Sequence, residues 1–301
     1  VKVQAKEKTG IGEVAPNIRF HETPEKVLSE FGIILNNELP IVKDLPALQK
    51  LLDQFKVGNS LRCGIENAYI DWYCKKEKIS PFSYLNLPKH TGTPTAFTVP
   101  IMDTERLQDF FLKNDLHRFK YIKVKVDAET GLETIREMDN ITEQPLMVDA
   151  NEAWKDVNEL LYFLEEIKDF NIHFVEQPLP AYMDEEYYEL KEKTPLPLFA
   201  DESITNKPDF VKLKRQFHGV NMKIMKAGGV ENGAKILKEA KAYEMQTMVG
   251  CMVETTVGIS NGYYLAGLAD YIDLDSFMYL ESDPAKIIKE TEGNLTLVNS
   301  K

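Results

Sequence analysis

Residues 121–126, with the sequence YIKVKV, predict a buried β-strand that carries two lysines. Side chains two positions apart share a face of a strand, so Lys123 and Lys125 point the same way. Two neighbouring ammonium groups on a core strand repel each other and are costly to desolvate. An edge strand with its lysines turned to solvent is the simplest explanation. The rest of the chain decides between that explanation and a functional site that contains both lysines.

A regular pattern begins at about residue 96, where short apolar runs start to alternate with amphipathic helical stretches. The runs are AFTVPI (96–101), YIKVKV (121–126), PLMVDA (145–150), IHFVEQ (172–177), PLFADE (197–202), GVNMKI (219–224), QTMVGC (246–251) and YIDLDS (271–276). Segments such as 156–170, 209–217 and 233–244 lie between them and carry apolar residues three and four positions apart. Eight strands with helical crossovers predict a modified TIM barrel of the (β/α)7β type. An open sheet is the rival, but no Gly-rich phosphate loop follows the first strand.

A smaller α+β capping domain is expected ahead of the barrel, over residues 1–92. We assign residues 93–280 to the barrel and residues 281–301 to a C-terminal segment that returns to the cap. Helical segments in the cap are expected at 23–36, 45–55 and 61–77. The opening residues have the character of the middle of a domain, so we expect further residues ahead of Val1.

Composition narrows the classes of partner. The 301 residues include 36 basic and 48 acidic side chains, which give a net charge of -12. That charge argues against nucleic acid or an anionic membrane surface as a partner. We find no apolar run long enough to span a bilayer, no signal peptide and, with three cysteines, no disulfide framework. We expect a cytoplasmic protein that acts on a small molecule, and no interface signature decides whether it forms a homo-oligomer.

Charged side chains recur where the predicted strands end. Asp149 ends the third strand, Glu176 the fourth and Asp201 the fifth, while Lys223 lies on the sixth. The carboxyl ends of barrel strands form the active-site face. Any one acid could simply cap the next helix. Three carboxylates on consecutive strands, with lysines on the strands at either side, favour a functional site.

The three carboxylates predict a site for a hard metal ion. Asp149, Glu176 and Asp201 offer oxygen ligands only, and the absence of His and Cys among them argues against zinc and copper. Such a set suits Mg²⁺, with Mn²⁺ as a substitute. Asn151 is expected to form a hydrogen bond to a metal ligand or to a metal-bound water, without binding the metal itself.

The lysines complete the predicted chemistry. A lysine near another cation and a divalent metal is pushed toward its neutral, basic form. It could then take a proton from the carbon next to a carboxylate, and Mg²⁺ would stabilise the resulting enediolate. One lysine of the pair Lys123 and Lys125 and the lysine Lys223, on opposite faces of the enediolate, predict 1,1-proton transfer, which is racemisation or epimerisation. The lysines of residues 121–126 would then face the barrel mouth, one as the base and one as an electrostatic helper.

Several motifs together resemble those of the enolase superfamily, in its muconate-lactonising-enzyme-like subgroup. They are KVK (123–125), DANEAW (149–154), VEQP (175–178), ADES (200–203), NMKIMKAGG (221–229) and VGCMVET (249–255), with GIGEVAP (10–16) and GIENAYIDWYC (64–74) in the region of the cap. The likeness covers nearly the whole chain, and the motifs occur in order with family-like spacing.

The resemblance implies a role for each motif residue. Lys125 and Lys223 would be the acid/base pair, the three carboxylates the metal ligands, and Lys123 the group that stabilises the bound carboxylate. Lys226 would face away from Lys223 on an extended strand, so we expect a supporting role for it. Glu202 would likewise face away from its neighbouring metal ligand and form hydrogen bonds.

The eighth strand helps to choose the reaction within the subgroup. Asp273 and Asp275 share a face and suit a substrate with a free ammonium group. The pair is similar to the Asp-x-Asp signature of dipeptide epimerases. For an L-Ala-L-Glu-like substrate, Arg19 is the candidate partner of the side-chain carboxylate, and Cys251 is expected in the pocket wall. The family's specificity loop between the first two cap strands is absent from this sequence, which leaves the side-chain preference open.

The sequence therefore predicts a Mg²⁺-dependent isomerase, a dipeptide epimerase of the L-Ala-D/L-Glu type. Two alternatives, o-succinylbenzoate synthase and muconate cycloisomerase, would use the same machinery for other reactions. A barrel that binds a peptide or metabolite without turnover is the alternative from a different class.

Overall fold

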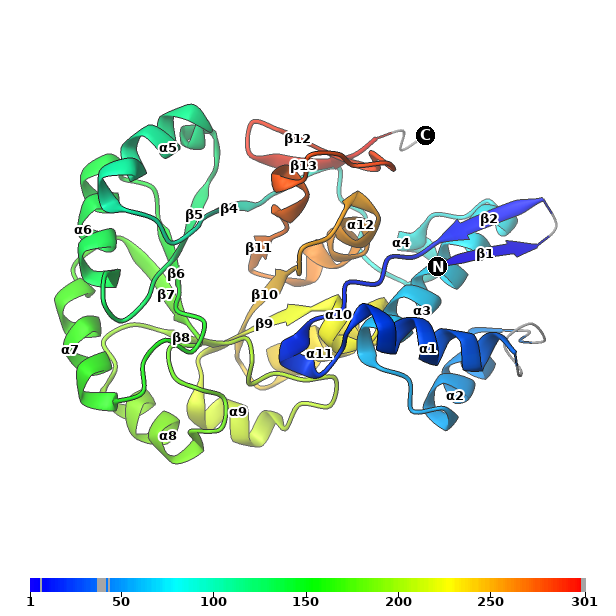
Figure 1. Cartoon of the computed structure of the whole chain (residues 1–301), viewed down its shortest axis with the longest axis horizontal. Helices are drawn as coiled ribbons and strands as arrows, with labels where there is room; N and C mark the ends of the chain where they lie inside the picture. The colour runs from blue at the N-terminus through cyan, green and yellow to red at the C-terminus, as the bar shows by residue number, and fades with distance from the viewer. Residues whose placement is uncertain (6, 37–41, 43, 299–301) are drawn as a thin grey trace.

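A barrel of parallel strands forms the body of the computed structural model, which describes residues 1–5, 7–36, 42 and 44–298 (Figure 1). The strand order is β11-β10-β9-β8-β7-β6-β5-β4, and paired neighbours run parallel. The strands are β4 (Ala96–Val99), β5 (Tyr121–Lys125), β6 (Leu146–Asp149), β7 (Ile172–Glu176), β8 (Leu198–Ala200), β9 (Gly219–Lys223), β10 (Gln246–Gly250) and β11 (Tyr271–Asp273). At the open seam, the Thr98 amide donates to Asp275 Oδ2 at 2.6 Å and the Leu274 amide to Thr95 Oγ1 at 2.9 Å. The sheet is therefore a nearly closed barrel, and the predicted fold class is confirmed.

Helices connect the strands and cover the outside of the barrel (Figure 1). They are α5 (Leu107–Lys113), α6 (Gly131–Ile141), α7 (Val157–Ile167), α8 (Asp184–Lys193), α9 (Phe210–Gln216), α10 (Ile224–Ala227), α11 (Val230–Ala242) and α12 (Thr256–Leu265), with the short 3-10 helices η3 (Thr104–Arg106), η4 (Leu116–Arg118), η5 (Ala266–Leu268) and η6 (Ser276–Tyr279). In α7 the buried residues Leu160, Phe163, Leu164 and Ile167 recur at helical spacing, and the Asp156 side chain caps its first turn. Polar residues remain on the outer face.

The interior of the barrel is built in layers by the alternation of side chains along each strand. Met147, Phe174 and Phe199 are fully buried in one layer, where the two phenylalanine rings stack with their centroids 3.8 Å apart. Two residues further along the same faces come the carboxylates that end β6 and β7 and follow β8. The apolar layer therefore forms the floor on which the charged residues stand.

The cap contains a β-hairpin and helices, on the right of Figure 1. Its elements are β1 (Lys2–Ala5), β2 (Lys8–Ile11), η1 (Ile18–Phe20), α1 (Pro24–Leu35), α2 (Leu45–Gln54), α3 (Asn59–Glu77) and α4 (Pro81–Tyr84). The chain after β2 passes very close to α3, because a Cβ on Gly12 would lie 1.9 Å from the carbonyl oxygen of Gly64. This contact brings the segment that follows Gly12 toward the barrel mouth.

The C-terminal hairpin of β12 (Ile288–Thr291) and β13 (Asn294–Leu297) pairs with β3 (Thr93–Pro94) rather than with the β1–β2 hairpin. Its Glu290 also forms an ion pair with Arg118, with the Nε and Oε1 atoms 3.0 Å apart. Both of these partners fall within the range assigned to the barrel, and the domain boundaries and the return of this segment to the cap stay predictions. Residues 299–301 lie outside the described residues. Of the helices that the structure describes, none has the length and apolar character needed to cross a membrane.

Candidate active site

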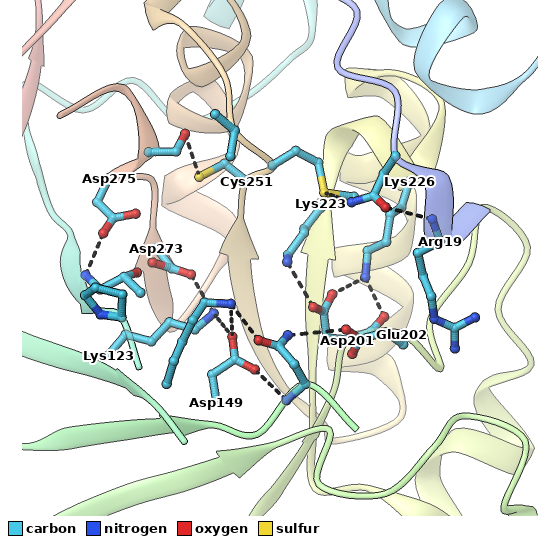
Figure 2. Close-up of a pocket in the computed structure, with 18 of the residues that line it drawn as sticks. Arg19, Lys123, Asp149, Asp201, Glu202, Lys223, Lys226, Cys251, Asp273 and Asp275 are labelled. Carbon is cyan, nitrogen blue, oxygen red and sulfur yellow. Dashed lines mark hydrogen bonds and ion pairs between the residues drawn. The ribbon is translucent and has the colours of Figure 1, made fainter. Parts of the chain in front are cut away.

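A cavity of about 460 Å³ opens at the carboxyl ends of the barrel strands (Figure 2). Its lining includes every residue that the sequence predicts for the site except Glu176. Glu176 lies just beneath, fully buried. The structure therefore gathers residues from Arg19 to Asp275 in one place.

Lys123 and Lys125 both line this cavity, as their alternation predicts. Their strand β5 lies between β4 and β6, so the edge-strand explanation is wrong. Lys123 is only 3% exposed. Its ammonium lies 2.8 Å from Asp273 Oδ2, 3.0 Å from Asp149 Oδ2 and 3.0 Å from Glu176 Oε2. Burial opposes the charged form, but these carboxylates outweigh it and raise the pKa of Lys123 well above its ordinary value.

Lys125 and Lys223 face each other across the barrel, because β5 and β9 are four strands apart in a sheet of eight. Lys125 Nζ donates to Asn151 Oδ1 at 2.6 Å, and Lys223 Nζ lies 2.9 Å from Asp201 Oδ2. Burial would lower the pKa of Lys223, but Asp201 raises it beyond its usual range. The predicted shift toward a neutral lysine depends on a bound divalent ion, and it stays a prediction.

The carboxylates Asp149, Glu176 and Asp201 come from β6, β7 and the turn after β8, between the two opposed lysines. Burial raises the pKa of Glu176, whose Oε2 lies 3.0 Å from the Lys123 ammonium. Among the described residues, no three His, Cys, Asp or Glu side chains stand in the arrangement of a metal site. The ammonium of Lys123 instead lies between Asp149 and Glu176. The three carboxylates offer oxygen donors alone and already surround one positive charge, which fits a hard cation, and the metal ligands stay a prediction.

Lys226 and Glu202 differ from their predicted orientations. The extended strand ends at Lys223, and the chain then turns into α10. Lys226 therefore points to Asp201, the carboxylate that Lys223 also contacts, and donates to Asp201 Oδ1 and to the Asp201 backbone oxygen. Glu202 follows the end of β8 at Ala200 and also lines the cavity. The prediction that these two side chains face away was wrong, because it assumed strand geometry beyond the ends of β8 and β9.

A hydrogen-bonded chain connects Glu202 to the lysine on the opposite wall. Asn151 Nδ2 donates to Glu202 Oε1 at 3.3 Å, while Asn151 Oδ1 accepts from Lys125. Burial, and then the negative charge of Asp201, raise the pKa of Glu202 to about 7. The predicted hydrogen-bonding role of Glu202 therefore has a partner in the structure.

Asp273 and Asp275 lie on the wall opposite the metal-binding candidates, and both line the cavity. Asp273 Oδ1 is buried without a hydrogen-bond partner, although Oδ2 contacts Lys123. Burial and the nearby Asp273 raise the pKa of Asp275 to about 7. Two acids with one unpaired buried oxygen offer a place for a hydrogen-bond donor.

Arg19 and Cys251 reach the cavity from the cap and from the end of β10. The Arg19 guanidinium forms a two-bond ion pair with Glu152, with Nη2–Oε1 at 2.6 Å and Nε–Oε2 at 3.1 Å. Cys251 Sγ donates to Ser276 Oγ at 3.4 Å, and burial raises the pKa of its thiol well above the ordinary value. A protonated thiol in a wall is consistent with the predicted packing role of Cys251.

Two buried amides support the site and were not found from the sequence. Gln177 Oε1 accepts from the amides of Asp201 and Ser203, at 2.9 and 3.0 Å, and so fixes the turn that carries Asp201. Asn221 Nδ2 donates to Glu176 Oε1 at 2.7 Å. The position of Asn221, two residues before Lys223 on one face of β9, was the available signal.

The comparisons with known proteins agree with this architecture. A family model described as "Enolase C-terminal domain-like" matches residues 103–284. The chain belongs to the enolase superfamily. Superfamily relatives include an "L-Ala-D/L-amino acid epimerase" of Flavobacterium johnsoniae, which is 30% identical over 99% of this chain and 88% of the relative. An "L-Ala-D/L-Glu epimerase" of Bacteroides thetaiotaomicron is 28% identical over 99% of this chain and 78% of its own length.

A solved structure named "L-Ala-D/L-Glu Epimerase" shares the superfamily fold with this chain. The two superpose with a TM-score of 0.87 at 26% sequence identity. The match covers 98% of this chain and 91% of that one. The likeness therefore includes both the cap and the barrel.

Proposed function

We propose that the protein is a dipeptide epimerase, an isomerase that inverts the α-carbon next to the free carboxylate of an L-Ala-D/L-Xaa dipeptide. The observation that carries this proposal is the placement of Lys125 and Lys223 on opposite walls of the barrel, with carboxylates between them. The names of the relatives support the same reaction class. Mg²⁺ is the proposed cofactor, with Mn²⁺ as a substitute, because the donor set contains oxygen alone.

The reaction moves one proton on and off one carbon. One lysine, as the free amine, takes the α-proton, and the electrons of the C–H bond enter the bond between the α-carbon and the carboxylate carbon. The opposed lysine, as the ammonium, donates its proton to the other face and so inverts the centre. Asp149, Glu176 and Asp201 would hold Mg²⁺, which supplies positive charge for the carboxylate oxygens and offsets the negative charge that keeps the lysines protonated.

Asp273 and Asp275 are proposed to bind the N-terminal ammonium of the dipeptide. Asp273 has a buried oxygen without a partner, and both acids line the wall across from the proposed metal ligands. A substrate with two carboxylates and no ammonium would be repelled by this wall. The same wall disfavours o-succinylbenzoate synthase and muconate cycloisomerase, and a binding protein without turnover has no need for opposed lysines.

Proton NMR in D₂O with Mg²⁺ tests the proposal, with L-Ala-L-Glu and L-Ala-L-Leu as separate substrates. We expect the α-proton signal of the C-terminal residue to disappear while the signals of the second diastereomer grow. The double variant Lys125→Ala/Lys223→Ala is the control and should show neither change. Absence of exchange with both dipeptides at millimolar concentration would refute the proposed function.

A further inference from the structure

A second cavity of about 550 Å³ adjoins the catalytic cavity beneath residues 15–22. The two cavities share Asn17, Arg19, Phe20, Glu202, Lys226 and Met252 in their walls. A substrate held between the opposed lysines can therefore extend a side chain into this second space. The chemistry of its walls then sets which side chains it accepts.

Glu152 neutralises the positive charge of Arg19, which lines both cavities. The Nε and Nη2 atoms of Arg19 both donate to the Glu152 carboxylate, and Glu152 Oε1 also accepts from the Ala181 amide at 2.7 Å. A two-bond pair anchored to backbone is more ordered than an ordinary surface ion pair. The other long cation of the described lining, Lys226, is engaged by Asp201. A substrate carboxylate that approaches Arg19 would meet a guanidinium whose charge Glu152 already offsets.

The backbone at Glu152 is consistent with a side chain held in place, although Glu244 and Glu292 adopt the same backbone region. Glu152 has φ 66° and the preceding Asn151 has φ 41°, so both lie in the left-handed region. Asn is common in that backbone region. A glutamate is strained there because of its Cβ, and a glycine would avoid this strain. Strain of this kind is kept where the surrounding structure holds a particular side chain in place. The Glu152 side chain is only 17% exposed, in keeping with such a role.

Apolar groups make up much of the remaining wall. Phe20, Met225, Met252 and Tyr182 line the second cavity, and Met225 is almost completely buried. Thioether and aromatic surfaces favour contact with apolar side chains and adapt to different shapes. The wall therefore offers apolar contact but no unpaired lysine or arginine among its described residues.

We propose that this second cavity receives the side chain of the residue that is epimerised, and that Glu152 makes it select an uncharged, apolar side chain over a carboxylate by neutralising Arg19. The inference rests on the proposed function and narrows its substrate class. Glu152 acts on specificity through Arg19 and not on the proton transfer. Its effect should therefore be seen in the preference between two substrates.

The test compares kcat/KM for L-Ala-L-Leu and L-Ala-L-Glu with the Mg²⁺-loaded protein. We expect the wild type to favour the leucine dipeptide by at least tenfold. Glu152→Gln removes the charge but keeps an oxygen that can accept from the Ala181 amide, so it should move the ratio at least tenfold toward L-Ala-L-Glu. Glu152→Gly should move the ratio in the same direction. Glycine adopts the left-handed backbone without strain, so this variant gives a second test if Glu152→Gln folds poorly.

Two controls isolate the effect. Glu166→Gln breaks a comparable arginine ion pair, Arg136–Glu166 at 2.7 Å, on the outer helices α6 and α7, and should leave the ratio unchanged. Adding Arg19→Met to Glu152→Gln should cancel the gain, because the gain requires a free guanidinium. A wild type that favours L-Ala-L-Glu, or a ratio unmoved by both Glu152 variants, overturns the inference and leaves the epimerase proposal standing. No turnover of either dipeptide by the wild type would overturn both.

Discussion

Lys123 and Lys125 show what a sequence determines for single residues. Alternation along a strand predicts that both side chains share a face, and both line the cavity. Their environments differ in a way that alternation does not reveal, because Lys123 is buried among carboxylates while Lys125 is over one-third exposed. The partner that completes the Lys123 cluster, Asp273, lies 150 residues further along the chain. Such pairing depends on barrel closure and not on local sequence.

The opposed lysines give a stereochemical prediction. In Lys223→Ala, only the epimer whose α-proton faces Lys125 should exchange with D₂O, and Lys125→Ala should show the opposite preference. Epimerisation itself should fall by roughly 10²–10⁴-fold in each variant, the usual contribution of a general acid or base. Proton NMR started from each pure epimer measures both quantities. Lys235→Ala, an exposed lysine on α11, is the control, and full epimerisation in both active-site variants would reject the two-base assignment.

Among the elements, the barrel strands were predictable because apolar runs of strand length recur between amphipathic helices. All eight runs contain a strand of the barrel sheet. The ends of the strands were less predictable, since the geometry changes where the backbone ladder stops. Lys226 and Glu202 were misplaced for this reason, and both follow the last residue of a strand.

A glycine in β9 tests the packing of the barrel floor. A Cβ on Gly219 would lie 2.4 Å from Cζ of the Phe199 ring, which itself is stacked on Phe174. We expect Gly219→Ala to lower the free energy of unfolding by about 1–3 kcal/mol, the usual cost of overpacking. Urea denaturation measures the change. Gly32→Ala is the matched control, because a Cβ there meets nothing within 4 Å and alanine in helix α1 should stabilise by about 0.5–1 kcal/mol.

The turn between β10 and α12 carries a buried acid whose titration affects stability. Burial, together with the nearby Glu13 carboxylate, raises the pKa of Glu254 to about 8. Between pH 4.5 and 8 the unfolded chain loses this proton while the folded protein keeps it, so the free energy of unfolding falls as the pH rises. Each pKa unit contributes about 1.4 kcal/mol, and the total for one buried group is of the order of a few kcal/mol.

Glu254→Gln should remove this contribution while its amide oxygen still accepts from the Met252 amide. We expect the loss of stability between pH 5 and pH 8 to be smaller in the variant than in the wild type, by a few kcal/mol. Other buried acids titrate in both proteins and cancel in the comparison. Chemical denaturation at the two pH values provides the measurement, with Glu166→Gln as an exposed control. Equal losses in wild type and variant would contradict the assigned protonation of Glu254.

For the whole molecule, the sequence predicted a cap and a barrel but not the contacts that join distant segments. The C-terminal hairpin pairs with β3, and its Glu290 binds Arg118, 172 positions earlier. The Arg19–Glu152 pair likewise joins the cap to the turn after β6, 133 positions apart. Glu152 lies in the DANEAW motif, but nothing in the local sequence predicts that it pairs with Arg19. Side-chain specificity, which depends on such a pair, was therefore beyond the sequence.

The concentration of acids at the barrel mouth makes the stability of the whole molecule depend on cations. Asp149, Glu176 and Asp273 surround one ammonium in a protein of net charge -12. A ligand that binds only the folded state at 100 times its Kd stabilises that state by about 2.7 kcal/mol. We therefore expect saturating Mg²⁺ to raise Tm by roughly 5 °C and EDTA to reverse the rise.

Asp149→Asn should lose the shift, whereas Asp139→Asn, at an exposed position on α6, should keep it at the same ionic strength. A shift of equal size in the wild type and both variants would mean that Mg²⁺ acts on the acidic surface in general, and the three carboxylates would then lose their assignment as its ligands.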